Sequence, residues 1–288
     1  MLRRAGLLLG LLLLAAAPAA TLEPPRNEKE LKALVDEGTA LYKEKRYEEA
    51  LARLVPATQA APQVGAIWVM RGNAESYSGQ PEVSLASFAH ALALDKNDWR
   101  AQTGRGVALL TLKRFDEASA AFGRTLEIKP GDQEALRLRA ASLHYAGKDA
   151  EALEAFQQVV ALDPKNAGSW RLQGVSLFRL ARYSEALESF DQAIRLDPTA
   201  SDAWMSKGSC LVKLGRDEEA LAAYDGAARR NALDPQVQYN KGVALQRLGR
   251  IDEARKALRR AVALRPDNAA AKAALEALPP GAPLPPGR

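Results

Sequence analysis

Between residues 167 and 200, apolar side chains form two stripes at helical spacing, separated by a short connecting stretch. The first stripe predicts one helix and consists of Trp170, Gly174, Leu177 and Phe178. The second stripe predicts another helix and consists of Ala186, Leu187, Phe190, Ala193 and Ile194. Pro198 follows and would end the second helix. Small residues in both stripes would allow the two backbones to cross closely, with Phe190 filling the space between them.

The same pattern recurs every 34 residues along most of the chain. The small residue of the first helix is at Gly38, Gly72, Gly106, Ala140, Gly174, Gly208 and Gly242. The small residue of the second helix is at Ala50, Ser84, Ala118, Ala152, Ala186, Ala220 and Ala254. The large residue between the two helices is at Leu54, Phe88, Phe122, Phe156, Phe190, Tyr224 and Leu258. Because a pair of short helices cannot bury its own stripes, neighbouring pairs are expected to cover them.

The period and the order of these residues resemble the tetratricopeptide repeat family, whose pattern is Trp-x-x-Leu-Gly-x-x-Tyr, then Ala-x-x-x-Phe, then Pro. The resemblance covers about five-sixths of the chain. It implies an all-α fold, a right-handed α-solenoid (superhelix) of seven helix-turn-helix units with 34 residues each. These units are residues 31–64, 65–98, 99–132, 133–166, 167–200, 201–234 and 235–268.

Two positions depart from the family pattern. The Leu before the Gly is replaced by a polar residue in every unit, at Glu37, Arg71, Arg105, Arg139, Gln173, Lys207 and Lys241. The family's Tyr is Leu in six units and Glu75 in the second. Glu75 therefore leaves the packing of the second helix pair open.

Residues 1–20 differ from the rest of the chain. Arg3 and Arg4 precede a 13-residue apolar run and a group of small residues that ends at Ala20, which is typical of a secretory signal peptide. We therefore expect an exported protein, periplasmic or secreted, with no stable membrane span after the signal is removed. The alternative is a membrane anchor formed by an uncleaved N-terminal segment.

Three short segments flank the repeats. Residues 21–30 predict a linker and the start of the first helix. Residues 269–278 predict a helix that caps the apolar face of the last unit, as the ends of stacked arrays require. Residues 279–288 contain five prolines and predict an extended or disordered tail.

The boundaries of the predicted helices carry two further signals. The first helices are followed by glycines that can adopt the left-handed conformation, at Gly79, Gly147, Gly215 and Gly249. Acidic residues cluster where second helices begin, at Glu48 and Glu49, Asp116 and Glu117, Glu218 and Glu219, and Asp252 and Glu253. Because they recur at one position of the repeat, we interpret them as charges that favour a helix N-terminus and not as an acid–base pair.

Few residues could support catalysis or bind a metal. His90 and His144 are the only histidines, and neither has a Cys, His or acidic partner at metal-ligand spacing. Cys210 is the only cysteine, so no intrachain disulfide can form, and we interpret it as a packing residue. Residues 104–106 (Gly-Arg-Gly) lack the third glycine and the preceding strand of a dinucleotide site. We therefore predict no enzyme activity, no cofactor and no metal.

First helices of such repeats line a concave groove, so their non-packing positions are the candidate contacts with a partner. These positions are Asn73, Tyr77, Arg100, Arg137, His144, Tyr145, Arg171, Arg179, Lys213, Tyr239, Asn240 and Arg247. Arg and Tyr are enriched at interface hot spots, and the strongest candidates are the central set, Arg137, Tyr145, Arg171 and Arg179. The sequence thus predicts a non-catalytic scaffold that binds another protein or peptide in this groove, within an envelope assembly.

An anionic polymer, either nucleic acid or an acidic polysaccharide, is the alternative ligand for the groove arginines and tyrosines. The formal net charge of +5 falls to +3 without Arg3 and Arg4, which is too low to point strongly to nucleic acid. Export also disfavours nucleic acid as a partner. A peptide or protein segment remains the preferred ligand.

Overall fold

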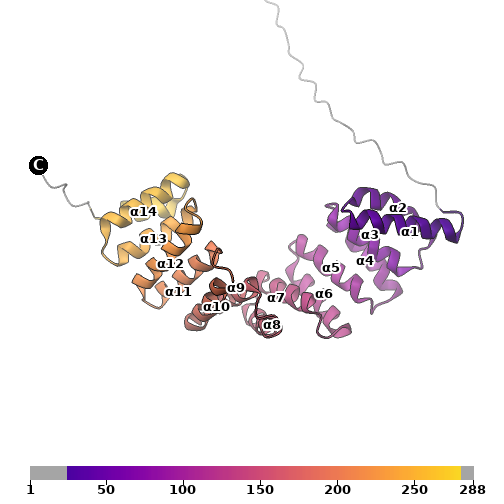
Figure 1. Cartoon of the computed structure of the whole chain (residues 1–288), viewed down its shortest axis with the longest axis horizontal. Helices are drawn as coiled ribbons and strands as arrows, with labels where there is room; N and C mark the ends of the chain where they lie inside the picture. The colour runs from indigo at the N-terminus through magenta and orange to yellow at the C-terminus, as the bar shows by residue number, and fades with distance from the viewer. Residues whose placement is uncertain (1–24, 280–288) are drawn as a thin grey trace, which may run out of the picture. The chain divides into compact units, whose positions relative to one another are not determined.

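The computed structural model describes residues 25–279, and these residues form fifteen α-helices with no strand among them (Figure 1). The predicted signal peptide and residues 280–288 of the predicted tail lie outside the described residues. The all-α prediction is confirmed. The helices from α1 to α14 are short because a turn or a left-handed residue interrupts the chain after about four helical turns.

First and second helices alternate along the chain. The first helices are α1 (Glu28–Lys43), α3 (Gly65–Tyr77), α5 (Trp99–Thr111), α7 (Gln133–Tyr145), α9 (Ala167–Arg179), α11 (Ser201–Lys213) and α13 (Pro235–Arg247). The second helices are α2 (Tyr47–Ala60), α4 (Pro81–Leu94), α6 (Phe115–Ile128), α8 (Asp149–Leu162), α10 (Tyr183–Leu196), α12 (Asp217–Arg230) and α14 (Ile251–Leu264). From α3 onward the first helices begin 34 residues apart, and α15 (Ala269–Glu276) begins at the same interval.

The chain divides into two compact units within α5, after Ala108. We call residues up to Ala108 the N-terminal unit and residues from Leu109 the C-terminal unit. Within each unit, helices pack against their neighbours in sequence order, as the consecutive ribbons of Figure 1 show. In the N-terminal unit α2 packs between α1 and α3, and α3 packs on α4. In the C-terminal unit the same order runs from α6 to α15.

The core of each helix pair is the large side chain on its second helix. These side chains are buried at Leu54, Phe88, Phe122, Phe156, Phe190, Tyr224 and Leu258, as predicted. A Cβ atom added at Gly174 would lie 2.8 Å from Cε1 of Phe190, and one added at Gly208 would lie 2.5 Å from Cε1 of Tyr224. Such contacts are too short for real carbon atoms, so the glycines are what allow the two helices to approach.

Glu75, whose packing the sequence left open, is buried beside α4 with only 2% of its surface exposed. Its carboxylate accepts hydrogen bonds from Nε of Arg71 at 2.8 Å and from Oγ of Ser87 at 2.6 Å. Arg71 also donates to Oγ1 of Thr58 at 3.1 Å. Arg71 and Glu75 are the two residues of this helix pair that depart from the family pattern. They are four residues apart on α3 and form one ion pair.

The turns after the first helices contain a left-handed residue at every equivalent position. Gly79, Gly147, Gly215 and Gly249 have φ between 73° and 85°, which confirms the prediction. In the other three turns the equivalent residue is not glycine: Lys45, Lys113 and Ala181 have φ between 57° and 63°. A side chain in this conformation costs about 1–2 kcal/mol relative to a right-handed one.

In five of the second helices, one acidic residue of the first turn forms an ion pair with the arginine at the N-cap. Glu49, Glu117, Glu185, Glu219 and Glu253 each accept two hydrogen bonds from the arginine three residues earlier. The arginine holds the pKa of the Glu49 and Glu253 carboxyls below the usual range. These pairs are exposed and recur at helix ends, so they support the structural interpretation and not an acid–base site.

The last helix, α15, packs on α14 in the C-terminal unit. Leu278, just after α15, is buried with Leu245 and Leu258. The apolar face of the last helix pair is thereby covered, as a stacked array requires.

The close contact between Gly174 and Phe190 predicts a large effect of added volume. Changing Gly174 to Leu should lower the free energy of unfolding by roughly 1–3 kcal/mol or more, because Phe190 cannot move out of a packed core. Urea unfolding followed by circular dichroism measures the loss. The control is Glu188→Leu on the exposed face of α10, which should change stability little; equal losses would contradict the assigned faces.

The buried pair on α3 predicts a coupled effect. Glu75→Leu leaves the Arg71 guanidinium without its carboxylate and should cost about 3 kcal/mol. The double variant with Arg71→Leu has the family's Leu at position 71 and the Leu of the other six units at position 75, and it should recover most of this loss. A double-mutant cycle by urea unfolding tests the coupling, and additive losses would show that the pair is not one unit.

The left-handed conformation of Ala181 predicts that glycine at this position will stabilise the protein. Ala181→Gly should raise the free energy of unfolding by about 0.5 kcal/mol, since it removes the left-handed cost at the expense of a more flexible unfolded chain. Gly215→Ala should do the reverse, by about 1 kcal/mol, because a Cβ there has no atom within 4 Å and only the backbone is strained. Thermal melting of both variants is the measurement; a shift of the same sign in both would refute the explanation.

Candidate functional site

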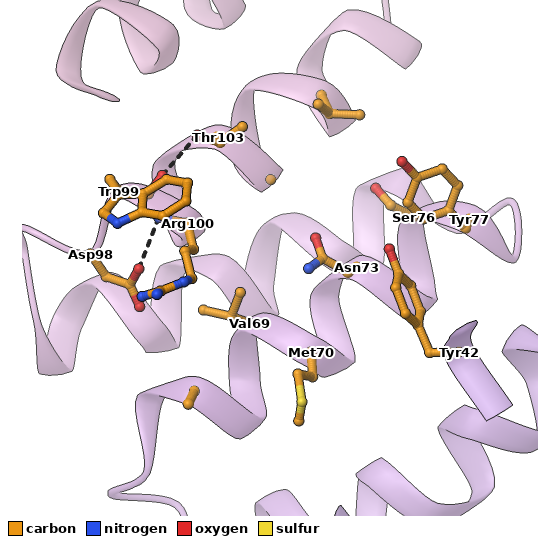
Figure 2. Close-up of a pocket in the computed structure, with 13 residues that line it drawn as sticks. Tyr42, Val69, Met70, Asn73, Ser76, Tyr77, Asp98, Trp99, Arg100 and Thr103 are labelled. Atoms are coloured by element: carbon orange, nitrogen blue, oxygen red, sulfur yellow. Dashed lines mark hydrogen bonds between the residues drawn. The ribbon is translucent and has the colours of Figure 1, made fainter. Parts of the chain in front are cut away.

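The N-terminal unit contains a cavity of about 540 Å³ on the side formed by its first helices (Figure 2). Its walls come from α1, α3 and the first turns of α5, and no second helix contributes to them. Tyr42 lies on α1, and the residues from Val69 to Tyr77 that reach the cavity lie on α3. The volume is in the range of sites that hold small molecules or a few side chains of a peptide.

Apolar and polar side chains share the wall of this cavity. Val69, Met70 and Val107 supply apolar surface, while Asn73 and Ser76 supply polar groups. In Figure 2, Asn73 lies between the two tyrosines at one end and Trp99 with Arg100 at the other. A mixed wall of this kind suits a segment that buries apolar side chains and forms hydrogen bonds through its backbone.

Arg100 stands at one end of the cavity, with its guanidinium 4.8 Å from the centre of the Trp99 ring. Asp98 caps α5, because its carboxylate accepts hydrogen bonds from the backbone N–H groups of Arg100 and Ala101 at 2.9 Å and 3.3 Å. Among residues 25–279 the Arg100 guanidinium forms no ion pair with a carboxylate. It is therefore available to an anionic group of a ligand.

Three tyrosines meet at the other end of the cavity. The rings of Tyr47 and Tyr77 stack with centres 5.4 Å apart, and Tyr42 lies 5.6 Å and 6.0 Å from them. Burial, together with the neighbouring Tyr77 and Tyr47, raises the pKa of Tyr42 to about 12. Its hydroxyl is thus protonated and can donate a hydrogen bond at any physiological pH. We call Tyr42, Tyr47 and Tyr77 the tyrosine cluster.

The predicted contacts divide between the two units. In the N-terminal unit Asn73, Tyr77 and Arg100 all line the cavity, and so does Thr103. The structure thus brings these residues together around one hollow, on the face that the sequence assigned to the groove.

The predicted arginines of the C-terminal unit are already paired within the chain. Arg137 pairs with Glu134 at 2.6 Å, Arg171 with Asp202 at 3.1 Å, Arg179 with Asp149 at 3.4 Å, and Arg247 with Asp217 at 2.8 Å. A ligand carboxylate would have to displace an internal one at each of them. The central set that the sequence favoured is therefore less available than Arg100.

The other predicted residues of the C-terminal unit are placed as follows. Tyr145 is exposed beside Phe115, with ring centres 5.5 Å apart, and Lys213 is exposed on α11. Tyr239 packs at the edge of an apolar cluster, and Asn240 accepts a hydrogen bond from Gln236 at 2.9 Å. None of these four residues lines the hollows of about 240, 150 and 330 Å³ in the described part of the C-terminal unit.

His144 corrects the sequence interpretation. The sequence assigned it to an open groove position, whereas the structure buries it with 4% of its surface exposed. Its Nδ1 lies 3.1 Å from Oγ of Ser176 on α9, the next first helix. Burial and the nearby Arg179 lower the pKa of His144. The ring therefore packs between two first helices and is not exposed in a groove.

Sequence reasoning missed Tyr42, Tyr47 and Trp99. Tyr42 occupies the same repeat position as His144, so position alone could have identified it. Tyr47 begins a second helix, whereas the predicted contacts were all assigned to first helices. The available signal was that Tyr42 and Tyr47 flank the turn between α1 and α2, while Tyr77 ends α3, which packs on α2.

The described residues contain little reactive chemistry. Cys210 is buried, and burial raises the pKa of its thiol to about 12, which disfavours the reactive thiolate. No three metal-binding side chains of residues 25–279 lie close enough together to hold an ion. Within the same residues, every helix is too short or too polar to cross a bilayer.

The repeat pattern also matches models of a known protein family. Tetratricopeptide repeat family models match residues 69–133, 114–167, 137–200, 171–236 and 235–268. The matches begin at residue 69, so the assignment of residues 31–64 to a first repeat stays a prediction. No curated protein matches the chain.

Solved structures share the fold at low sequence identity. MamA is 24% identical over 57% of this chain and 96% of its own, with a TM-score of 0.54. A tetratricopeptide repeat protein from Parabacteroides merdae ATCC 43184 is 16% identical over 86% of this chain and 98% of its own, with a TM-score of 0.61. MamA from Desulfovibrio magneticus RS-1, from residue 41 to its end, is 21% identical over 58% of this chain and 95% of its own, with a TM-score of 0.56.

Three observations lead to one assignment. Helix pairs recur along the chain, small residues lie at their crossings, and the family models match more than half of the chain. The fold is typical of scaffolds for protein–protein interaction, which are generally non-catalytic. This chain belongs to the tetratricopeptide repeat family.

Proposed function

We propose that this protein is a non-catalytic scaffold that binds a segment of another protein along its first helices. The observation that carries the proposal is the cavity of the N-terminal unit, with the Arg100 guanidinium at one end and Tyr42 and Tyr77 of the tyrosine cluster at the other. An extended segment could bury one or two apolar side chains against Val69, Met70 and Val107. Asn73 would then bind its backbone, and Arg100 would bind an acidic group.

The residues around the cavity fit a hot spot. Tyr and Arg are among the residues whose replacement by alanine costs the most binding free energy at interfaces, particularly in pockets that exclude water. Here the guanidinium of Arg100 is held against Trp99, which reduces the entropy lost when it binds a carboxylate. Tyr77 is 57% exposed, so a partner can cover it.

An anionic polymer fits the groove less well than a protein segment. Of the groove arginines singled out from sequence, Arg137, Arg171, Arg179 and Arg247 each lie within ion-pair distance of a carboxylate of the same chain. A polymer held by phosphates or uronates needs several uncompensated cations and gives binding that weakens steeply with salt. This pairing favours the protein ligand.

We further propose that the protein acts outside the cytoplasm, in an envelope assembly. The support is the sequence of residues 1–20, in which two arginines precede an apolar run and small residues. N-terminal sequencing of the protein purified from its source cells tests cleavage near Ala20. An intact Met1 with the protein in the membrane fraction would favour the anchored alternative.

The cavity predicts which substitutions abolish partner binding. The double variant Tyr77→Ala and Arg100→Ala should reduce capture of the partner from an extract of the source cells by about tenfold or more, since it removes both ends of the site. Quantitative mass spectrometry of the captured proteins is the measurement, with circular dichroism to verify the fold.

The matched control is the double variant Tyr145→Ala and Arg171→Ala in the C-terminal unit, where Arg171 is already paired with Asp202. It should retain the partner. Loss of the partner in the control alone would place the site in the C-terminal unit and reject this cavity.

A further inference from the structure

In three helix pairs a tryptophan of the first helix packs beside the second helix. These residues, Trp68, Trp170 and Trp204, occupy one position of the 34-residue repeat. Each indole N–H donates a hydrogen bond to the backbone carbonyl six residues earlier, at 2.8, 3.0 and 3.2 Å respectively. In the last helix pair the same position is occupied by Gln238. The last pair therefore lacks the ring.

The neighbours of these rings define the space that each ring fills. A Cβ atom added at Gly226 on α12 would lie 2.6 Å from Cε3 of Trp204, and Nζ of Lys207 lies 5.8 Å from the centre of the Trp204 ring. In the N-terminal unit the ring of His90 on α4 stacks on Trp68, with centres 4.4 Å apart. His90 and Gly226 occupy the same position of the repeat, so both indoles fill the equivalent space of their helix pair.

In the last helix pair this space is a hollow of about 330 Å³ between α13 and α14. Gln238, Lys241 and Arg260 line it, and Leu245 and Ala257 supply apolar surface. Lys241 and Arg260 hold the two repeat positions that flank the indole in the preceding pair. The hollow therefore lies where a tryptophan ring lies in the other pairs.

The amide of Gln238 has no partner within the described chain. Only 7% of the surface of Gln238 is exposed, and its side chain forms no hydrogen bond with another residue of 25–279. Nη2 of Arg260 donates to the carbonyl of Ala232, six residues before Gln238, at 3.4 Å. This is the carbonyl that an indole at position 238 would use. A buried amide without a partner costs free energy, so it indicates that a ligand completes the site.

The hollow also carries a net positive charge. Two of its charged side chains are compensated within the chain. These pairs are Lys241 with Asp225 at 2.6 Å and Glu253 with Arg250 at 2.7 Å. The other two, Lys256 and Arg260, are exposed and form no ion pair with a carboxylate of residues 25–279. Since the preceding pair has Ala222 and Gly226 at these positions, the two uncompensated charges are particular to the last pair.

Charge and shape together select the ligand. A simple anion would pair with Lys256 and Arg260 but would leave the apolar wall of Leu245 and Ala257 uncovered. An uncharged ring would cover this wall but would leave both cations without a partner. An aromatic ring with an acidic group beside it satisfies both. Because the fold is typical of scaffolds that bind proteins, the source of such a ring is a protein segment.

We propose that the hollow between α13 and α14 binds an aromatic side chain of a partner protein that has acidic residues beside it. The ring fills the space of the missing indole and has Lys241 as its cation–π partner. The acidic residues pair with Lys256 and Arg260, and the amide of Gln238 binds the backbone of the segment. This site belongs to the C-terminal unit and does not depend on the cavity of the N-terminal unit.

A short peptide, Gly-Asp-Trp-Asp-Gly with 5-fluorotryptophan at its centre, tests the chemistry. Fluorine NMR observes the peptide alone, so the four tryptophans of the full chain do not interfere. We expect line broadening that saturates as the full chain is added. Unlabelled peptides then compete for the site. Replacing the tryptophan by alanine, or both aspartates by asparagine, should weaken competition by about tenfold in each case.

Two variants test the location of the site. Gln238→Trp fills the hollow from within the chain, so it should abolish peptide binding and raise the melting temperature. The matched control is Gln236→Trp, the same change on the same helix outside the hollow, and it should leave peptide affinity unchanged. The double variant Lys256→Gln and Arg260→Gln changes exposed residues only. It should keep the fold and weaken binding by about tenfold.

Several outcomes would overturn the proposal. These are the absence of saturable binding, unchanged affinity in Gln238→Trp or in the Lys256 and Arg260 variant, and equal competition by the alanine peptide. Free indole-3-acetate that binds as tightly as the peptide would reject a protein segment as the ligand. The double variant Tyr77→Ala and Arg100→Ala should bind the peptide as the unchanged chain does. Loss of binding there would assign the peptide to the cavity of the N-terminal unit, which would reject this inference and retain the proposed function.

Discussion

The structure depends on one contact, which is made where the two helices of a pair cross. A residue with no side chain, such as Gly72 or Gly174, faces a ring such as Phe88 or Phe190 at a distance that leaves no room for a Cβ. Because the ring is buried on all sides, its position fixes how the second helix lies on the first. Within each unit the next first helix packs on that second helix, so a crossing also sets the position of its neighbour.

The fold could be predicted from sequence because this contact is local and recurs. Gly174 and Phe190 are only 16 residues apart, and the same spacing separates Gly72 from Phe88 and Gly208 from Tyr224. A local pattern of this kind can be recognised in the sequence without knowing which distant parts of the chain are in contact. The left-handed turn residues were predictable for the same reason, although the chain also uses Lys45, Lys113 and Ala181 where glycine would be expected.

The site could be predicted only in part. Repeat position indicates which side of a first helix is open, and Asn73, Tyr77 and Arg100, selected in this way, all line the cavity. Their contact with a partner stays a prediction. It does not show which charges neutralise one another, since Arg179 and Asp149 are 30 residues apart in sequence and come together only where α9 packs on α8 of the preceding helix pair. It also missed Tyr42 and Tyr47, because three rings from three helices converge at a point that no single helix pattern describes.

Since each helix pair within a unit touches little besides its neighbours in sequence, the chain is built from interchangeable pieces. Duplication or deletion of one 34-residue piece would rejoin two surfaces of the same kind, and no contact elsewhere would have to be redesigned. Evolution can therefore change the length of such a protein in single steps. The residues around the cavity of the N-terminal unit can meanwhile diversify to suit a new ligand, independently of the repeats that follow them.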